Sequence, residues 1–198
     1  MYVPNGIDDS FIRRCPNYAN QGNKLRVLLE GSISSPFKGM KDAFAAVEGL
    51  DCEVWCVSVS GTPEPGWHCD RFIRRAAMHE MKYIYSSCDI LLKMSRVEGF
   101  FGPPMEMMAC GGLCVTGKVT GYDEYIVDGE NALVVEMGDV AGAKASLQKL
   151  IDDPDLREKL RRGGKKTAAE WGWSRSIDTL EALYSRLGNE LDDIRTQY

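Results

Sequence analysis

The sequence predicts an α/β fold, a Rossmann-like, doubly wound parallel sheet of about six strands with helices on both faces. Short apolar runs recur along the chain, helical patterns alternate with them, and a loop rich in glycine and proline follows one of the runs. Continuous apolar runs are typical of strands buried on both faces of a parallel sheet. Their alternation with helices favours parallel connections, which supports the same fold class.

Six segments are expected to form the strands. The first is LRVLLE at residues 25–30, and the others follow at residues 53–59, 71–73, 89–94, 113–116 and 132–136. The segment at residues 71–73 is expected to be short. Ligands bind at the carboxyl edge of such a sheet, so the loops that follow these segments are the first place to search for a site.

Helices are expected between the strands, over residues 38–47, 78–88 and 105–110, with one helical turn within 122–127. In the first of these, apolar residues recur at the spacing of a buried helix face. A glycine pair after Cys110 is a C-terminal stop signal for the third. Pro103 and Pro104 exclude a continuous helix between Glu98 and Glu106, so Glu98 is expected in a loop and Glu106 in the first helical turn.

The chain after residue 139 is expected to be helical. Two helices cover residues 140–151 and 154–171, and Asp153 followed by Pro154 marks the start of the second. Ser174 is expected to cap a third helix. Its apolar residues that share one face are Ile177, Leu180, Leu183, Tyr184 and Leu187. This face is more apolar than a free terminal tail requires.

The composition argues against several classes of function. A net charge of −5 and a pI near 5.2 disfavour a surface that follows a nucleic-acid backbone, so we expect no nucleic-acid partner. The seven cysteines are an odd number without CxxC pairs, which indicates reduced thiols in a cytoplasmic protein and no structural zinc. We expect neither a signal peptide nor a transmembrane segment, and leave peripheral contact with the inner membrane face open.

The densest chemical signal lies at residues 95–112, SRVEGFFGPPMEMMACGG, which run from a predicted strand end through a loop into a helix. A helix N-terminus preceded by glycines offers free backbone N–H groups to phosphate oxygens. A carboxylate beside it suits the vicinal hydroxyls of a sugar. On spacing alone a second interpretation stays open, in which Glu106 complements the helix dipole and Glu98 is solvated.

The segment EGFFGPPMEMMACGG at residues 98–112 closely resembles the E-x7-E block of retaining GT-B glycosyltransferases, particularly family 4, the group 1 type. That block is usually written EGFGLPxLEAMACG. Upstream, MKYIYSSCD at residues 81–89 is similar to the family's helix ending in YxxAD, and downstream GYDEYIVDGEN at 121–131 is similar to GxxEIVxDGxNG. VPNGID at residues 3–8 resembles the motif that opens the family's C-terminal domain, so the resemblance covers nearly the whole chain.

The resemblance implies the donor-binding half of a GT-B fold and transfer of a sugar from a nucleoside diphosphate to a hydroxyl acceptor, with retention. In similar proteins the second glutamate, here Glu106, binds the ribose hydroxyls, and the first, here Glu98, binds the donor sugar. Lys38 matches the lysine that contacts the diphosphate, where its charge would stabilise the leaving group. Lys38 and Glu98 are therefore the expected catalytic pair. The remaining donor-binding residues expected are Gly31, Ser32, Arg74, Gly99, Phe100, Phe101 and Gly102.

Three departures from the family pattern bear on that site. Ser32 follows the strand-one glycine where the family often has arginine, so half of the phosphate clamp is missing. Phe101 replaces a loop glycine, which changes how closely the backbone approaches the sugar. Arg74 stands where many relatives have glycine beside the base, and Arg74 or Arg75 is a candidate for the lost cation.

The resemblance also implies how the chain is divided. Residues 1–24 are expected to hold a remnant of the interdomain linker, residues 25–173 the nucleotide-sugar-binding domain, and residues 174–198 a helix that crosses back to an N-terminal domain. That missing domain would hold the acceptor, a glycan or a lipid-linked compound. We therefore expect the isolated chain to bind a donor without transferring sugar.

No cofactor and no metal are expected. Asp153 and Asp155 spell a DxD motif, but their place between two helices favours helix capping over metal binding. His68 and His79 lack the surroundings of a nucleophilic triad. Two functional alternatives stay open: a nucleotide-sugar epimerase of the same fold, and a non-catalytic module that binds nucleotide sugars.

Overall fold

The computed structural model describes residues 3, 5–11, 15 and 22–196 of the chain. Its centre is a six-stranded sheet in the order β3-β2-β1-β4-β5-β6, in which all neighbouring strands are parallel. The strands are β1 (Arg26–Glu30), β2 (Glu53–Ser58), β3 (Arg71–Arg74), β4 (Ile90–Lys93), β5 (Leu113–Gly117) and β6 (Leu133–Val135). The predicted doubly wound parallel sheet is confirmed.

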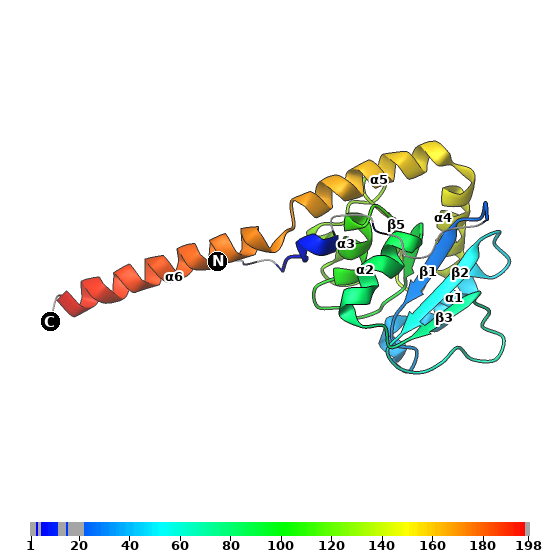
Figure 1. The fold of residues 1–198 in the computed structure, drawn as a ribbon, viewed down its shortest axis with the longest axis horizontal. Helices are drawn as coiled ribbons and strands as arrows, with labels where there is room; N and C mark the ends of the chain where they lie inside the picture. The colour runs from blue at the N-terminus through cyan, green and yellow to red at the C-terminus, as the bar shows by residue number, and fades with distance from the viewer. Residues whose placement is uncertain (1–2, 4, 12–14, 16–21, 197–198) are drawn as a thin grey trace.

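The strand order creates a switch point between β1 and β4. From β1 the chain adds β2 and β3 on one side, then crosses over to add β4, β5 and β6 on the other (Figure 1). Ligands of open α/β sheets bind outside the carboxyl ends of the strands at such a point. The fold therefore singles out the loops after β1 and β4.

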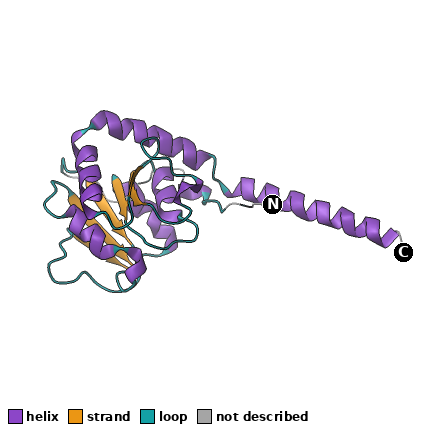
Figure 2. Ribbon diagram, turned by 180° about the vertical axis from the view of Figure 1, so that it is seen from behind, coloured by secondary structure: helices purple, strands orange, loops and turns teal. Residues whose placement is uncertain are grey.

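Helices cover both faces of the sheet (Figure 2). α1 (Met40–Val47) and α4 (Val140–Asp152) pack on the face to which Val27 and Leu29 of β1 contribute. α2 (Met78–Ser87) and α3 (Gly102–Ala109) pack on the face of Leu28. Because successive side chains of a strand point to opposite faces, β1 contributes to both cores.

The helix after β1 begins later than predicted. Pro36–Lys38 forms a 3-10 turn, and α1 begins at Met40 instead of Lys38. Gly39 separates the two with a φ of 60°, and a Cβ atom there would lie 1.9 Å from the carbonyl oxygen of Met94. Glycine is required both by the left-handed backbone and by the contact with the end of β4. Lys38 is therefore carried by a turn.

The helix after β4 begins earlier than predicted, at Gly102, so Glu106 lies in its second turn and not in its first. Pro103 and Pro104 occupy the first turn, where proline is tolerated because the N–H groups of that turn have no partner within the helix. The prolines still keep Glu98 in the preceding loop, as predicted. Gly111, with a φ of 79°, ends the helix as the glycine signal predicts.

The C-terminal helices differ slightly from the prediction. α5 (Pro154–Ala169) ends before Trp171, whose ring centroid lies 6.1 Å from that of Phe100 and 5.6 Å from that of Tyr125. α6 (Trp173–Thr196) begins one residue before Ser174 and extends away from the body of the molecule (Figure 1, Figure 2). In the described part of the chain, no helix is both long and apolar enough to cross a membrane.

The N-terminal segment expected to be a linker is partly packed on the domain. Asp9–Phe11 forms a 3-10 turn, and Ile7 and Phe11 are buried in the core on the α2 and α3 face. The Ile7 backbone N–H donates to the carbonyl of Trp171 at 2.9 Å. The rest of the expected linker, residues 1–2, 4, 12–14 and 16–21, lies outside the described residues.

Candidate functional site

The loops after β1 and β4 are joined to one another at the carboxyl edge of the sheet. The backbone N–H of Arg96 donates to the carbonyl of Phe37 at 2.8 Å. Two residues further on, Gly39 packs directly against the carbonyl of Met94. These backbone contacts fix the distance between Lys38 on one loop and Glu98 on the other.

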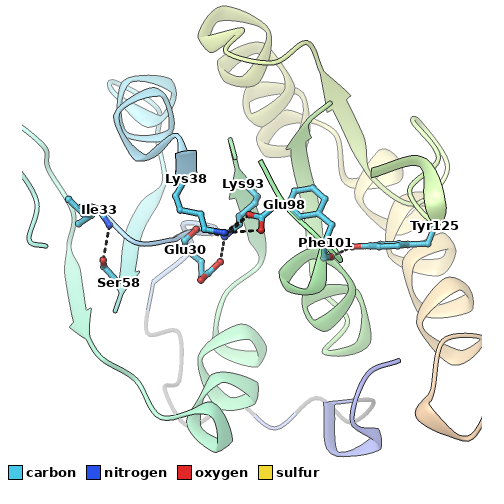
Figure 3. A network of polar contacts seen from close by, with 8 residues as sticks. All are labelled: Glu30, Ile33, Lys38, Ser58, Lys93, Glu98, Phe101 and Tyr125. Atoms are coloured by element: carbon cyan, nitrogen blue, oxygen red, sulfur yellow. Dashed lines mark hydrogen bonds and ion pairs between the residues drawn. The ribbon is translucent and has the colours of Figure 1, made fainter. Parts of the chain in front are cut away.

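Lys38 and Glu98 form an ion pair across the two loops (Figure 3). The Lys38 Nζ donates to both carboxylate oxygens of Glu98, at 2.9 Å to Oε1 and 2.8 Å to Oε2. The Glu98 side chain is only 10% exposed, whereas that of Lys38 is 31% exposed. Lys38 is therefore the partner that an incoming anion can reach.

A second ion pair, between Glu30 and Lys93, lies beside the first (Figure 3). Glu30 ends β1, Lys93 ends β4, and the Lys93 side chain is 2% exposed. The Lys93 Nζ donates to the Glu30 carboxylate and, at 2.9 Å, to the Glu30 carbonyl. It also lies 4.0 Å from Oε1 of Glu98. A buried ammonium is costly unless it is paired and hydrogen-bonded, and here it is both.

Glu106 lies close to this group of charges, on α3. The buried Tyr85 hydroxyl of α2 hydrogen-bonds to its carboxylate. Burial raises the pKa of Glu106; the Tyr85 hydrogen bond opposes that rise, Glu30 adds to it and Lys93 opposes it. Burial also raises the pKa of Tyr85 well above its ordinary value, so its hydroxyl stays protonated and can donate. We call Glu30, Lys38, Lys93, Glu98 and Glu106 the charged cluster.

The glycine-rich loop offers fewer backbone donors than expected. The N–H of Gly102 already donates a hydrogen bond to the carbonyl of Phe100 at 2.9 Å, and the two prolines that follow have no N–H. Within the described residues, the N–H groups of Gly99, Phe100 and Phe101 have no hydrogen-bond acceptor. Of the three residues, Gly99 is exposed and Phe100 half-buried, so their N–H groups remain able to bind an anion, whereas Phe101 is buried.

Phe101, where the family has a loop glycine, is buried beneath α3. The residue as a whole is 1% exposed, and its side chain belongs to the hydrophobic core. Its carbonyl accepts a hydrogen bond from the buried Tyr125 hydroxyl (Figure 3). The carbonyl of Tyr125 is bound in turn by Asn131 Nδ2 at 2.7 Å, and Asn131 also donates to Thr167 of α5 at 2.9 Å. The downstream motif thus anchors the loop.

The remaining predicted donor residues lie on the β1 side of the switch point. Gly31 is buried, and its N–H continues the sheet by donating to the carbonyl of Val57 at 3.1 Å. The Ser32 hydroxyl contacts that of Ser60 in the loop after β2. Arg74 is exposed at the end of β3, three strand positions from β4. No contact unites Arg74 with the charged cluster among the described residues.

The competing sequence signals have structural explanations. Asp153 is the N-cap of α5, where its Oδ1 accepts from the Leu156 N–H at 2.9 Å, so the capping interpretation of the DxD motif is confirmed. His68 is exposed and lies 3.5 Å from Asp70. His79 is exposed on α2. Within the described residues, no group of three or more histidine, cysteine or acidic side chains is arranged to hold a metal ion.

The sequence prediction missed Glu30, Lys93 and Tyr85. Glu30 and Lys93 stand at or near the ends of the apolar runs LRVLLE and DILLKM. These positions could have indicated a contact, because neighbouring parallel strands bring their carboxyl ends together. Tyr85 lies inside a helix segment that already matched a family motif, and nothing in its spacing indicated a contact with Glu106.

The chain is similar to known proteins in both sequence and structure. Residues 70–167 match the model of the family described as glycosyl transferases group 1. An uncharacterized glycosyltransferase of Methanocaldococcus jannaschii is 28% identical over 115 residues, which are 58% of this chain and 33% of that protein. The aligned part of the chain thus spans about a third of that relative.

Two solved structures share the fold. Sucrose-phosphate synthase from Thermosynechococcus elongatus superimposes with a TM-score of 0.82 at 18% identity, over 95% of this chain and 52% of that one. Anabaena HepE, solved in complex with UDP-glucose, gives a TM-score of 0.76 at 17% identity, over 92% of this chain and 57% of that one. The chain therefore corresponds in fold to about half of each of these proteins.

Proposed function

Since the chain belongs to the group 1 glycosyltransferases, with the fold of one half of a GT-B enzyme, we propose that its charged cluster is the site for a nucleoside diphosphate sugar. The observation that carries the proposal is the ion pair of Lys38 and Glu98 at the switch point of the sheet, beside a second pair whose charges act on Glu106. Ligands of this fold class bind at that edge. Anabaena HepE, which shares the fold, was solved in complex with UDP-glucose.

Each residue has a proposed role that suits its chemistry. Glu106 accepts hydrogen bonds from the ribose hydroxyls, because an ionised carboxylate is an acceptor with two oxygens. Glu98 accepts hydrogen bonds from the hydroxyls of the donor sugar. Lys38 and the free N–H groups of Gly99 and Phe100 bind the diphosphate and stabilise the charge that develops on it as the glycosidic bond breaks.

The partly exposed Lys38 is the group that changes its partner in this proposal. Its ammonium is paired with Glu98 at 2.8 Å. A diphosphate carries more negative charge than a carboxylate and competes for the same ammonium. Donor binding thus releases Glu98 from Lys38 and makes its oxygens available to sugar hydroxyls. Arginine at the position of Ser32 would have shared the phosphate charge, so Lys38 carries more of it here.

The reaction proposed for the whole enzyme is transfer of the sugar to a hydroxyl acceptor with retention at the anomeric carbon. The acceptor, a glycan or a lipid-linked compound, binds to a second domain, and α6 crosses to that domain. The exposed side chains of Trp173, Ile177, Leu180, Tyr184 and Leu187 on α6 support this role. On this proposal residues 25–173 form the donor domain, residues 1–24 belong to the interdomain linker, and residues 174–198 reach the partner domain.

Titration calorimetry with pairs of ligands tests the proposed function. The pairs are UDP with UDP-glucose, GDP with GDP-mannose, and ADP with ADP-glucose. We expect one pair to bind, with the sugar conjugate binding more tightly than its bare nucleoside diphosphate. The same ligands should raise the melting temperature, because a ligand that binds only the folded state stabilises it. Absence of saturable binding by every pair would overturn the proposal.

A further inference from the structure

The function proposed so far gives no individual role to the ion pair of Glu30 and the buried Lys93. The register of β1 and β4 pairs Leu28 with Leu91 and Leu29 with Leu92, so Glu30 and Lys93 follow as the next neighbours. Leu28 and Leu91 point to the face covered by α2 and α3, and alternation puts Glu30 and Lys93 on that face too. They therefore lie on the side of the sheet that carries Glu106.

This ion pair is not expected to contribute much to the stability of the folded state. Replacing a buried ion pair with apolar residues of similar volume is often neutral or stabilising, because both charges lose their hydration when they are buried. The Lys93 side chain is 2% exposed and ends a strand whose other residues are apolar, so a methionine would suit the position. Packing therefore does not explain why this position holds a lysine.

The position of the Lys93 ammonium supplies that reason. Its Nζ is fixed by the carbonyl and the carboxylate of Glu30, and it lies 4.0 Å from Oε1 of Glu98. The same Oε1 atom accepts from Lys38 at 2.9 Å. Glu98 is thus flanked by one ammonium that is partly exposed and one that is buried and anchored.

We propose that Lys93, anchored by Glu30, is a positioning residue that holds the Glu98 carboxylate in place for the donor sugar when the diphosphate draws Lys38 away. This inference rests on the proposed function, because it requires Lys38 to exchange Glu98 for phosphate. Lys93 is too enclosed to bind the diphosphate itself, so it acts through Glu98. The effect of Lys93 on Glu106, whose pKa it lowers, extends its influence to the second glutamate of the site.

A double-mutant cycle tests this role. Affinities for UDP and UDP-glucose, or for whichever of the three pairs binds the wild-type chain, are measured by calorimetry for Lys93→Met, Glu98→Ala and the variant with both changes. We expect Lys93→Met to weaken the sugar conjugate tenfold or more while changing the bare nucleoside diphosphate less than about threefold. In the Glu98→Ala background, Lys93→Met should have little further effect, because residues that act as a unit are not additive.

Two further variants control for loss of folding and for the change in net charge. Lys93→Met with Glu30→Gln removes both charges of the pair, and it carries the test if Lys93→Met alone does not fold. Lys24→Met removes an exposed lysine paired with Asp51, with the same change in net charge, and should leave both affinities unchanged.

The outcomes separate the two proposals. If the wild-type chain binds none of the pairs, the proposed function fails. If it binds a pair but Lys93→Met weakens both ligands equally, or weakens the conjugate as strongly in the Glu98→Ala background, Lys93 does not act through Glu98 and the inference is overturned.

Discussion

At the scale of single residues, the site contains some side chains that could be predicted from the sequence and others that could not. Lys38, Glu98 and Glu106 were predictable because a long ordered motif surrounds them. Lys93 was not, because it ends an apolar run and its partner Glu30 is 63 residues away. Pairing of that range depends on strand order, and no local pattern in the sequence encodes it.

Glu106 is predicted to cost stability at neutral pH. Burial raises its pKa in the folded state, so the folded protein binds a proton more tightly than the unfolded chain does. The stability that this group contributes is therefore fully present at pH values below its unfolded pKa and is lost as the pH rises through the folded pKa. Glu106→Gln, which cannot ionise, should be more stable than the wild type at pH 7.

Denaturant unfolding between pH 4 and pH 8 checks this prediction. The stability advantage of Glu106→Gln should grow with pH, by about 1.4 kcal/mol for each unit by which the folded pKa exceeds the unfolded one. Glu136→Gln is a control, since the Glu136 side chain is 71% exposed. If the stability difference between Glu106→Gln and the wild type were constant across the pH range, burial would not raise the pKa of Glu106 in the folded state.

At the scale of elements, the strands were predicted well and the helix starts less well. Continuous apolar runs identify buried strands whatever their tertiary contacts. The start of α1 is shifted by the contact between Gly39 and Met94, and the start of α3 by prolines that a first turn accepts. Both differences arise from tertiary packing or from rules specific to one turn. Both occur beside the site.

Gly39→Ala is predicted to damage both stability and donor binding. The methyl group would lie 1.9 Å from the carbonyl oxygen of Met94, so the Lys38 turn and the end of β4 must separate. Gly49→Ala is the matched control, because Gly49 also has a positive φ but its added Cβ would meet nothing closer than 3.8 Å.

The control should lose about 1–2 kcal/mol, the cost of a left-handed alanine, and keep its affinity for the nucleotide. Gly39→Ala should lose more stability and also bind the nucleotide more weakly, as measured by unfolding and calorimetry. Equal behaviour of the two variants would mean that the contact between the loops does not position Lys38.

At the scale of the whole molecule, the chain has the fold of about half of the solved glycosyltransferases that it matches. The fold class was predictable from alternating strands and helices, and right-handed connections limit the possible strand orders without selecting one. The direction of α6 was not predictable, because no contact within the described domain fixes most of its length. Its exposed apolar side chains include Tyr184 at 65% and Ile177 at 50%.

Donor binding is predicted to need no divalent metal. Lys38 and the free loop N–H groups supply positive potential, and the DxD motif is occupied in capping α5. Affinity for the nucleoside diphosphate should therefore be the same with and without EDTA. A loss of more than about tenfold on chelation, recovered with magnesium or manganese, would show that the phosphate contacts have been misassigned.

The division of the donor between Glu106 and Glu98 is the central claim, and one set of titrations tests it directly. Wild type, Glu98→Ala and Glu106→Ala are each titrated with UDP and UDP-glucose, or with the pair that the wild type prefers. Glu106→Ala should weaken both ligands by about 1.5–3 kcal/mol, the range for hydrogen bonds to a charged group. Glu98→Ala should leave the bare nucleoside diphosphate nearly unaffected and weaken only the sugar conjugate. Equal losses for both ligands in both variants would contradict the account.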